Sequence, residues 1–441
     1  MTDEEFLQGK GTLQHSANAK IINQGNLTTA QGGQIVLASQ QIENAGQINA
    51  PQGQVQLLAG QSTRINVTAD GLIQTELPSG AANGSIKNSG VIRANGGQVD
   101  VLASGQNSQI QHTGIIEAQS IVEKDGKIYL IAGYEGQSIA PKTGQTVVDG
   151  VLDASAPNGG NGGFIETSAG QVNITDNAKV TTKATQGKSG TWLIDPTDFT
   201  INAGNAPQTA SGIGATTLEN SLNNGSVTIQ TSSAGTEQGN IYVNDNIAWS
   251  ANNLTLTAHN SIHVNAEMNV NSTGTLALNT GATGTVKMAM GENGFVGKIN
   301  FNGNNLGWGV LEINGQPYYL FNTINDLQDY YANNSHIALA VDINAADTVN
   351  WNNGTGFEPL SLNGQIFNGL GHTINNLAIN RPIDGDIGLV GTNWGGNISN
   401  IGLRNAKLNF RQQEENHLME NIIYNELLAR GYNVDVGVVG I

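Results

Sequence analysis

Residues 25–38 read GNLTTAQGGQIVLA, residues 46–59 read GQINAPQGQVQLLA, and residues 90–103 read GVIRANGGQVDVLA. The three stretches share a glycine, a short alternating run, a glycine-rich turn and a second alternating run that ends in alanine. Apolar residues that alternate with polar ones predict short β-strands, and glycine marks the turns between them. Related copies start at Gly71, Gly114 and Gly150. The repeat therefore predicts tandem strand units of about 20–25 residues each.

A unit of this length with two or three strands is typical of one coil of a parallel β-helix. Each coil pairs its backbone with the coils on either side at a spacing of ~4.8 Å. Val, Ile, Leu and Ala then point inward, Gln, Asn, Thr and Asp point to water, and Gly and Asn form the corners. A β-sandwich also has strands every roughly 8–12 residues, but it has no need of near-copies of one unit in tandem. We therefore expect an all-β fold, a parallel β-helix.

The composition excludes several classes of protein. The 441 residues include 18 Lys+Arg against 35 Asp+Glu, which gives a formal net charge of -17. This acidic balance and the lack of basic clusters oppose a nucleic-acid-binding protein, and no apolar run approaches the ~18 residues of a transmembrane helix. The chain has no cysteine, which excludes a disulfide framework, a thiol nucleophile and a cysteine-ligated zinc site.

The pattern changes along the chain, although the repeats favour one elongated domain over the roughly three that length alone suggests. Within the third segment, residues 323–331 predict a short helix with Thr323 or Asn325 as its cap. We expect five segments, namely clear strand repeats (1–185), weaker strand repeats (186–304), an aromatic-rich insertion that includes Trp308 (305–361), glycine-rich repeats (362–409) and a more charged helix-strand segment (410–441).

Several of these stretches resemble two-partner secretion exoproteins, the filamentous-haemagglutinin-like and high-molecular-weight adhesins of Gram-negative bacteria. Residues 2–9, residues 22–25 and the GGxVxLxA units carry the resemblance, and residues 187–201, GKSGTWLIDPTDFTI, are its most specific string. It covers roughly residues 1–300. Residues 363–403 resemble glycine-rich repeats of bacterial surface proteins.

The resemblance implies a right-handed parallel β-helix that acts as a non-enzymatic adhesin shaft without a cofactor. Such a protein is secreted or held at the cell surface, with an outer-membrane transporter as export partner and a surface receptor or glycan as target. Neither nucleic-acid binding nor membrane insertion is expected. Because the start has neither a basic nor an apolar leader region, we expect no signal peptide in this chain and interpret it as a fragment of a longer exoprotein.

The family string predicts a structural motif rather than a catalytic one. Pro196 is expected to interrupt strand pairing, an aspartate to cap a turn, and Trp192 with Phe199 to fill the core. The residues carried over from the family are Gly190, Thr191, Trp192, Leu193, Ile194, Asp195, Pro196, Asp198 and Phe199.

Other motifs allow chemistry but also have simpler interpretations. Asp195 and Asp198 place two carboxylates close together, as in polysaccharide-cleaving enzymes, but the neighbouring sequence lacks aromatic platforms. Residues 187–189, Gly-Lys-Ser, lack the earlier glycine of a phosphate loop and are expected to form a turn. Residues 159–163 resemble half of a calcium-binding repeat without its aspartate, and we expect a corner loop.

A histidine pair and a set of glycosylation triplets are weaker indications of function. His259 and His263 stand four residues apart and, with Glu267, can begin a metal site, but surface histidines are the simpler interpretation. Asn-x-Ser/Thr triplets arise by chance in so asparagine-rich a chain, so glycosylation stays a hypothesis; they begin at Asn26, Asn66, Asn173, Asn224, Asn253, Asn333, Asn353 and Asn397.

The last segment differs from the rest. Residues 420–432, ENIIYNELLARGY, resemble the C-terminal region of bacterial ATP-binding proteins, although the phosphate-binding part is absent. Residues 410–441 are therefore interpreted as a gene-fusion or frameshift scar, or alternatively as a helical cap on the repeats.

Two other functions remain open at the level of sequence. The chain can be the stalk of a contact-dependent toxin protein, which a downstream toxin domain would reveal. It can also be a polysaccharide-acting β-helix enzyme, for which clustered carboxylates and aromatics across several coils would be the sign.

Overall fold

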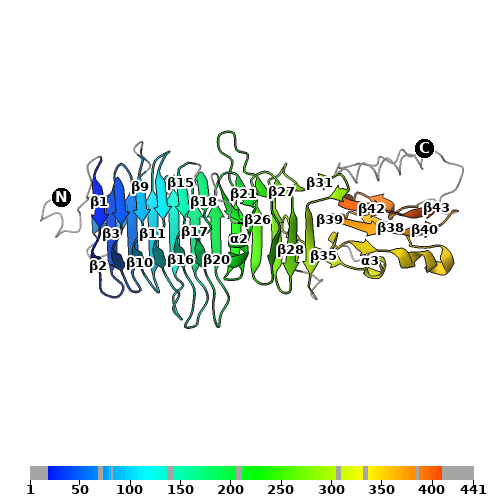
Figure 1. The fold of residues 1–441 in the computed structure, drawn as a ribbon, viewed down its shortest axis with the longest axis horizontal. Coiled ribbons are helices and arrows are strands. Elements are labelled where there is room, and N and C mark those ends of the chain that lie inside the picture. The colour runs from blue at the N-terminus through cyan, green and yellow to red at the C-terminus, as the bar shows by residue number, and fades with distance from the viewer. Residues whose placement is uncertain are drawn as a thin grey trace. The chain divides into compact units, whose positions relative to one another are not determined.

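The computed structural model of the chain describes residues 18–67, 73–78, 80, 83–136, 143–204, 211–303, 309–330, 336–382 and 387–409. Residues 2–9, Gly71, Trp308 and the predicted helix-strand segment 410–441 lie outside the described residues. The described part is an all-β protein with long parallel sheets (Figure 1). It divides into unit 1 (Met1–Tyr242, Asn252–Ile262 and Thr280–Thr285) and unit 2 (Val243–Ala251, His263–Asn279 and Val286–Ile441).

Three parallel sheets make up most of unit 1. Sheet 1 runs in the order β1 (Lys20–Asn23), β4 (Gln41–Asn44), β9 (Ser85–Asn88), β12 (Gln109–His112), β15 (Gln145–Val148), β18 (Gln171–Ile174), β22 (Gly212–Gly214) and β21 (Phe199–Asn202). Sheet 2 runs in the order β2 (Asn26–Thr28), β5 (Gln47–Asn49), β10 (Val91–Arg93), β13 (Ile115–Glu117), β16 (Val151–Asp153) and β19 (Lys179–Thr181). Sheet 3 runs in the order β3 (Gln34–Ser39), β6 (Gln54–Ala59), β11 (Gln98–Ala103), β14 (Lys127–Ala132), β17 (Phe164–Ser168), β20 (Thr191–Asp195), β23 (Ser226–Gln230) and β26 (Asn253–Thr257).

Successive strands of the chain visit the three sheets in turn. We call β1-β2-β3, β4-β5-β6, β9-β10-β11, β12-β13-β14, β15-β16-β17 and β18-β19-β20 strand triplets, because each gives one strand to each sheet. The triplets pair in register, so that Ile92 in β10 lies between Ile48 in β5 and Ile116 in β13. All three isoleucines are at most 1% exposed. Burial of each such side chain stabilises the fold by about 1.5–3 kcal/mol.

The repeat glycines are required because adjacent triplets approach closely at one corner. A Cβ atom on Gly90 would collide with the carbonyl oxygen of Gly46, and Gly114 stands in the same relation to Gly90. Gly150 in turn faces the carbonyl oxygen of Gly114. None of these four glycines has a positive φ. The glycine that opens each repeat is thus set by steric contact with the preceding triplet.

Gly71 lies outside the described residues, but the residues that follow it from Ile73 do not form the predicted repeat. β7 (Arg64–Val67) and β8 (Ile73–Glu76) pair with each other in antiparallel fashion, and β5 pairs directly with β10. The hairpin is therefore an insertion between two triplets. Thr75 Oγ1 donates a hydrogen bond of 3.0 Å to Gln56 Oε1, so the hairpin lies against the outward face of sheet 3.

One helix in unit 1 was not anticipated. α2 (Ala215–Leu222) follows β22 in a region where only strands were expected. Leu218 and Leu222 stand four residues apart, which places both on one face of the helix, and both are 0% exposed. Only one turn of apolar spacing marks this helix in the sequence, which is why the strand pattern around it obscured it.

Unit 2 contains shorter sheets. One sheet consists of β25 (Ile247–Trp249), β28 (Glu267–Asn271) and β33 (Lys298–Asn302). The largest set of paired strands in unit 2 consists of β29 (Thr275–Asn279), β34 (Leu311–Ile313), β35 (Gln316–Phe321), β36 (His336–Leu339), β39 (Ile366–Asn375), β37 (Ile343–Asn344) and β42 (Asn397–Arg404). Two-stranded pairs are β38 (Leu360–Asn363) with β41 (Val390–Trp394), β40 (Ala378–Asn380) with β43 (Lys407–Asn409), and β31 (Met290–Gly291) with β32 (Gly294–Phe295). β24 (Ile241–Val243) and β27 (Ile262–Val264) have residues in both units, and β30 (Val286–Met288) lies in unit 2.

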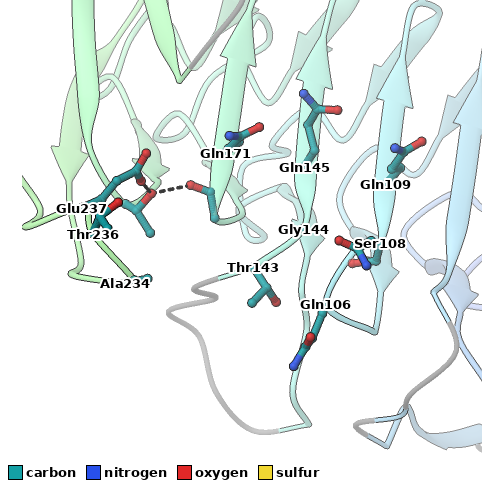
Figure 2. Close-up of a pocket in the computed structure, with 14 residues that line it drawn as sticks. Gln106, Ser108, Gln109, Thr143, Gly144, Gln145, Gln171, Ala234, Thr236 and Glu237 are labelled. Carbon is teal, nitrogen blue, oxygen red and sulfur yellow. Dashed lines mark hydrogen bonds between the residues drawn. The ribbon is translucent and has the colours of Figure 1, made fainter.

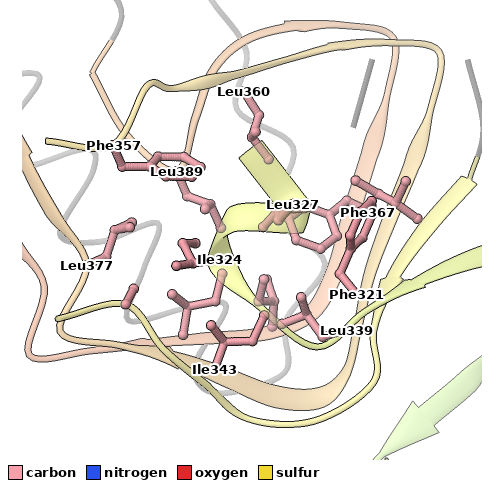
Figure 3. Close-up of a cluster of buried hydrophobic side chains, with 14 of the residues drawn as sticks. Phe321, Ile324, Leu327, Leu339, Ile343, Phe357, Leu360, Phe367, Leu377 and Leu389 are labelled. Atoms are coloured by element: carbon pink, nitrogen blue, oxygen red, sulfur yellow. The ribbon is translucent and has the colours of Figure 1, made fainter. Parts of the chain in front are cut away.

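The helix predicted at residues 323–331 is confirmed as α3 (Ile324–Tyr330). Thr323 caps it, because its Oγ1 accepts a 3.1 Å hydrogen bond from the backbone N–H of Asp326. Ile324 and Leu327 point from α3 into an apolar cluster that includes Phe357 and Leu360 (Figure 3). α3 is followed, after β36 and β37, by the 3₁₀ segments η1 (Ala346–Asn350) and η2 (Asn352–Gly354).

Candidate functional site

The motif predicted at residues 190–199 lies on β20, an interior strand of sheet 3, and on the corner that follows this strand. Thr191, Trp192, Leu193, Ile194 and Asp195 form β20, and Phe199 opens β21. A Cβ on Gly190, just before β20, would meet the carbonyl oxygen of Gly163 in the preceding triplet. Gly190 therefore belongs to a second set of close glycine contacts, at the corner that precedes the strands of sheet 3.

The aromatic residues of the motif are buried in the core. Trp192 is 1% exposed and Phe199 is 0% exposed. The indole Nε1–H of Trp192 donates to Thr167 Oγ1 at 3.1 Å, which satisfies the one polar group that its burial removes from water. The prediction that these two side chains fill the core is confirmed.

Asp198 fixes a neighbouring loop. Its Oδ1 accepts hydrogen bonds of 2.7 Å from the backbone N–H groups of both Gly239 and Asn240. Between Asp195 and Asp198, Pro196 is buried and its carbonyl oxygen accepts from the N–H of Ser232 at 3.0 Å. The corner is thus held by several backbone contacts to residues about forty positions further along the chain.

The two aspartates of the motif make different contacts. Asp195 is 2% exposed and lies on the outward face of β20, beside Ser168 of β17. Burial, and then the neighbouring charge of Glu166, raises the pKa of Asp195 to about 7. Asp198 instead accepts from backbone amides, as expected of the aspartate that was predicted to cap a turn.

Buried carboxylates instead follow the outward face of sheet 3. Asp100, Tyr129 and Glu166 are register partners on β11, β14 and β17, and Asp100 and Glu166 are each 5% exposed. Burial raises the pKa of Asp100 and of Glu166, against hydrogen bonds from neighbouring side chains that act to lower both. Gln54 and Gln98 each donate to Asp100 at 2.7 Å. We call Asp100, Glu166 and Asp195 the carboxylate row.

A second buried row crosses sheet 1 and was missed by the sequence analysis. Asn23 Nδ2 donates to Asn44 Oδ1 at 2.8 Å, and Asn44 Nδ2 donates to Asn88 Oδ1 at 2.7 Å. Asn88 Nδ2 then faces His112 Nδ1 at 3.1 Å, and His112 Nε2 faces the carbonyl oxygen of Val151 at 3.0 Å. The sequence does contain a signal for this row, because each of the four side chains belongs to a residue that stands two positions before a repeat glycine.

The hydrogen bonds of this row fix the form of His112. An amide N–H₂ group donates to Nδ1, so Nδ1 accepts and Nε2 carries the proton that it donates to Val151. His112 is 1% exposed. Burial lowers its pKa to about 4, and the hydrogen bonds to Val151 and Asn88 only partly oppose that shift. We call Asn23, Asn44, Asn88 and His112 the amide ladder.

In unit 2 the polar centre is Asp342. Its Oδ1 accepts from the N–H of Thr373 at 2.8 Å and its Oδ2 accepts from Lys298 Nζ at 2.8 Å. His372 Nδ1 lies 3.3 Å from Asp342 Oδ1, and His372 Nε2 lies 2.9 Å from the carbonyl oxygen of Ile299. Burial acts to raise the pKa of Asp342, but hydrogen bonds from His372, Lys298 and Thr373 outweigh it and hold that pKa well below its usual value. The glycine-rich string around His372 therefore has a structural role.

One open groove of unit 1 is polar. Gln109, Gln145 and Gln171 lie in register on β12, β15 and β18 and form one wall (Figure 2). A loop that carries Thr236 and Glu237 closes one end, and the volume is about 700 Å³. Glu237 Oε2 accepts a hydrogen bond from the hydroxyl of Thr197. Among the described lining residues Glu237 is the one carboxylate, so the groove offers amides for polar contacts rather than an acid-base pair.

The remaining motifs have structural contacts in the described residues. Lys188 N donates to Asn161 Oδ1 at 3.0 Å, so residues 187–189 stack on the loop at 159–163. His259 is exposed after β26, whereas His263 is a half-buried residue of β27. Within the described ranges no group of three His, Cys, Asp or Glu is placed to hold a metal ion. The sequon at Asn333 lies outside the described residues.

Part of the chain is similar to a known protein. No protein-family profile matches the chain. Over 103 residues, 21% of this chain, the sequence is 41% identical to halomucin of Haloquadratum walsbyi, and that stretch is 1% of the length of halomucin. Among the helices of the described residues, none combines the length and the apolar character needed to cross a membrane.

Proposed function

We propose that the chain is part of the shaft of a non-enzymatic adhesin, and that unit 1 is a right-handed parallel β-helix. The observation that carries this proposal is the set of six strand triplets whose members join the same three sheets in the same order. In such a helix each triplet is one coil, and the buried side chains of the three sheets share one core. The amide ladder and the corner glycines are the contacts that stacked coils require.

This architecture suits a secreted shaft. Each coil contacts mainly its neighbours, so coils can fold one after another as an unfolded chain leaves a pore. The net charge of -17 keeps shafts soluble and apart. The proposed partners are therefore an outer-membrane transporter during export and a receptor or glycan on another cell, and the proposed location is outside the cell or on its surface. Residues 187–201 serve this function as a corner of the shaft.

Cell binding tests the proposal. The full chain, labelled with a fluorophore, is incubated with erythrocytes and epithelial cells, and an unrelated acidic β-protein of similar size serves as control. Saturable binding of the chain and not of the control supports an adhesin. Absence of saturable binding to any surface, including bacterial cells, contradicts the adhesive role.

The carboxylate row favours a second candidate, a polysaccharide-acting enzyme. Asp100, Glu166 and Asp195 lie with Tyr129 on one outward face across successive strands, which is the arrangement expected of such an enzyme. The burial of all three carboxylates favours the adhesin instead, because a polymer needs access to them. Release of reducing ends or unsaturated products from pectin-like polymers, lost in Glu166→Gln, would support the enzyme. A stalk of a contact-dependent toxin is the third possibility, and a toxin domain downstream would identify it.

A further inference from the structure

Unit 2 contains a cleft beside α3 that no part of the proposed shaft requires. Its volume is about 590 Å³, within the range of pockets that bind small ligands. The lining side chains come from α3, from the 3₁₀ region and from the residues that follow it, namely Asn325, Gln328, Asp329, Trp351, Asn352 and Glu358.

Trp351 provides a rigid aromatic surface in this cleft. Its ring stacks on that of Phe357, with centroids 6.4 Å apart and planes 30° apart. Phe357 is 0% exposed and belongs to the apolar cluster that also holds Ile324 and Leu327 of α3 (Figure 3). The indole therefore rests on the core of unit 2 while it lines the cleft. A platform anchored in this way loses little conformational entropy when a ligand binds.

The two walls of the cleft are tied together. Gln328 of α3 donates from Nε2 to the carbonyl oxygen of Glu358 at 3.2 Å, and its Oε1 accepts from the N–H of Glu358 at 2.9 Å. After Trp351 the backbone has positive φ at Asn352 (51°) and Asn353 (58°). Asn352 Nδ2 donates to the carbonyl oxygen of Gly356 at 2.8 Å, which holds this strained loop in place. Strained backbone of this kind is concentrated at binding sites.

The chemistry of the lining selects the ligand. Asn325, Asp329, Asn352 and Glu358 are exposed and combine amide donors with carboxylate acceptors. Each sugar hydroxyl both donates and accepts, so it can use both kinds of group. The C–H face of a sugar ring is apolar and packs on an aromatic ring. No described lining residue is cationic, so an anionic ligand is disfavoured.

We propose that this cleft binds a neutral sugar residue, and that Trp351 is the surface on which the sugar ring packs. This inference rests on the proposed adhesive function, because it names the glycan contact of the adhesin. A cationic group would also be attracted to an indole with two carboxylates nearby, but cages for such groups surround the cation with several aromatic rings. Among the described lining residues Trp351 is the one aromatic side chain.

The test compares the full chain with three variants on an array of neutral oligosaccharides, followed by calorimetric titration with the best-binding oligosaccharide. Trp351→Ala removes the platform, and Asp329→Asn removes one hydroxyl acceptor without touching the apolar cluster. Trp394→Ala is the matched control, because Trp394 is 72% exposed in the same unit and does not line the cleft. We expect about tenfold or greater loss of affinity for Trp351→Ala, a smaller loss for Asp329→Asn, and no change for Trp394→Ala.

Each outcome decides the proposal. Circular dichroism and thermal melting establish that the variants fold, and Asp329→Asn carries the test if Trp351→Ala does not. Absence of binding to every neutral oligosaccharide, or equal binding by wild type, Trp351→Ala and Asp329→Asn, overturns the site. Preferential binding of choline or a lysine-rich peptide overturns the ligand class. If wild type and Trp351→Ala bind cells equally well, the adhesin proposal stands and the cleft is not its contact; if neither binds cells but wild type binds sugar, the cleft stands and the adhesin proposal fails.

Discussion

Acidification should weaken unit 1 through His112. The folded protein holds this imidazole neutral because its pKa is lowered to about 4, whereas the same group in the unfolded chain titrates near its ordinary value of 6.5. Between these values the unfolded state binds more protons than the folded state, so stability falls as the pH drops through this window. The full difference corresponds to about 3 kcal/mol, of which about 2 kcal/mol is lost between pH 7 and pH 4.5.

The amide ladder explains why the proton is excluded. A proton on Nδ1 of His112 would point at the amide N–H₂ group of Asn88, so two donors would face each other. Rotation of the Asn88 amide would relieve that conflict but would also break its bond from Asn44. His112→Asn removes the titrating group and continues the row of asparagines. This variant should therefore resist acid better than the wild type.

Hydrogen-exchange mass spectrometry of peptides that cover β12 and β13 provides the local measurement, since chains of stacked units do not always unfold in one step. The full-length wild type and His112→Asn are compared at pH 7 and pH 4.5, with rates corrected for the intrinsic effect of pH. Carboxylates titrate in both proteins, so the difference between them isolates His112. Equal loss of protection on acidification in both proteins would refute the reasoning.

Three further perturbations test other contacts. Asp195→Asn should raise the melting temperature more at pH 8 than at pH 5, because the folded-state pKa of about 7 means that stability is lost progressively as the pH rises from about 4 to 7. Equal effects at both values would contradict this. Gly90→Ala should lower the free energy of unfolding, measured with denaturant, by at least about 2 kcal/mol, because the added methyl group meets a backbone carbonyl. Gly25→Ala should leave it nearly unchanged, because the space around Gly25 is open. Similar losses in both variants would argue against the corner contact. Asp342→Asn should increase hydrogen exchange in β37 and β39. The wild-type protein should show the same increase only at low pH, where the Asp342 carboxylate, whose pKa is lowered, becomes protonated. Unchanged exchange in the variant would show that Asp342 does not stabilise these strands.

The repeat pattern predicted the strands and their order well, because alternating apolar residues bounded by glycines are compatible with few structures other than short strands joined by tight turns. Gly46, Gly90, Gly114 and Gly150 stand at equivalent corners, and the runs after them pair in register. The hairpin of β7 and β8 was misassigned because alternation alone does not distinguish parallel from antiparallel pairing. α2 was missed because a single turn of apolar spacing is a weak signal against the strand pattern around it.

The site was predicted less well than the fold. Burial of Trp192 and Phe199 follows from their size and apolar character. By contrast, Asp195 and Asp198 are close in sequence but contact different partners. Asp195 is the last residue of a strand and Asp198 lies in the corner after it, so their side chains point in different directions. The carboxylate row and the Trp351 cleft bring together residues far apart in the chain, which composition and spacing do not reveal.

The most direct test of the account is a distance along sheet 2. Because the chain has no cysteine, spin labels can be attached at Asn26→Cys and Lys179→Cys, which replace the first residues of β2 and β19. Five strand-to-strand steps separate these strands in the sheet, so their Cα atoms should lie about 24 Å apart. A narrow pulsed electron-resonance distance distribution near that value, allowing for the label arms, is the predicted result. A broad distribution, or one centred far from it, would contradict the stacked triplets on which the proposed shaft depends.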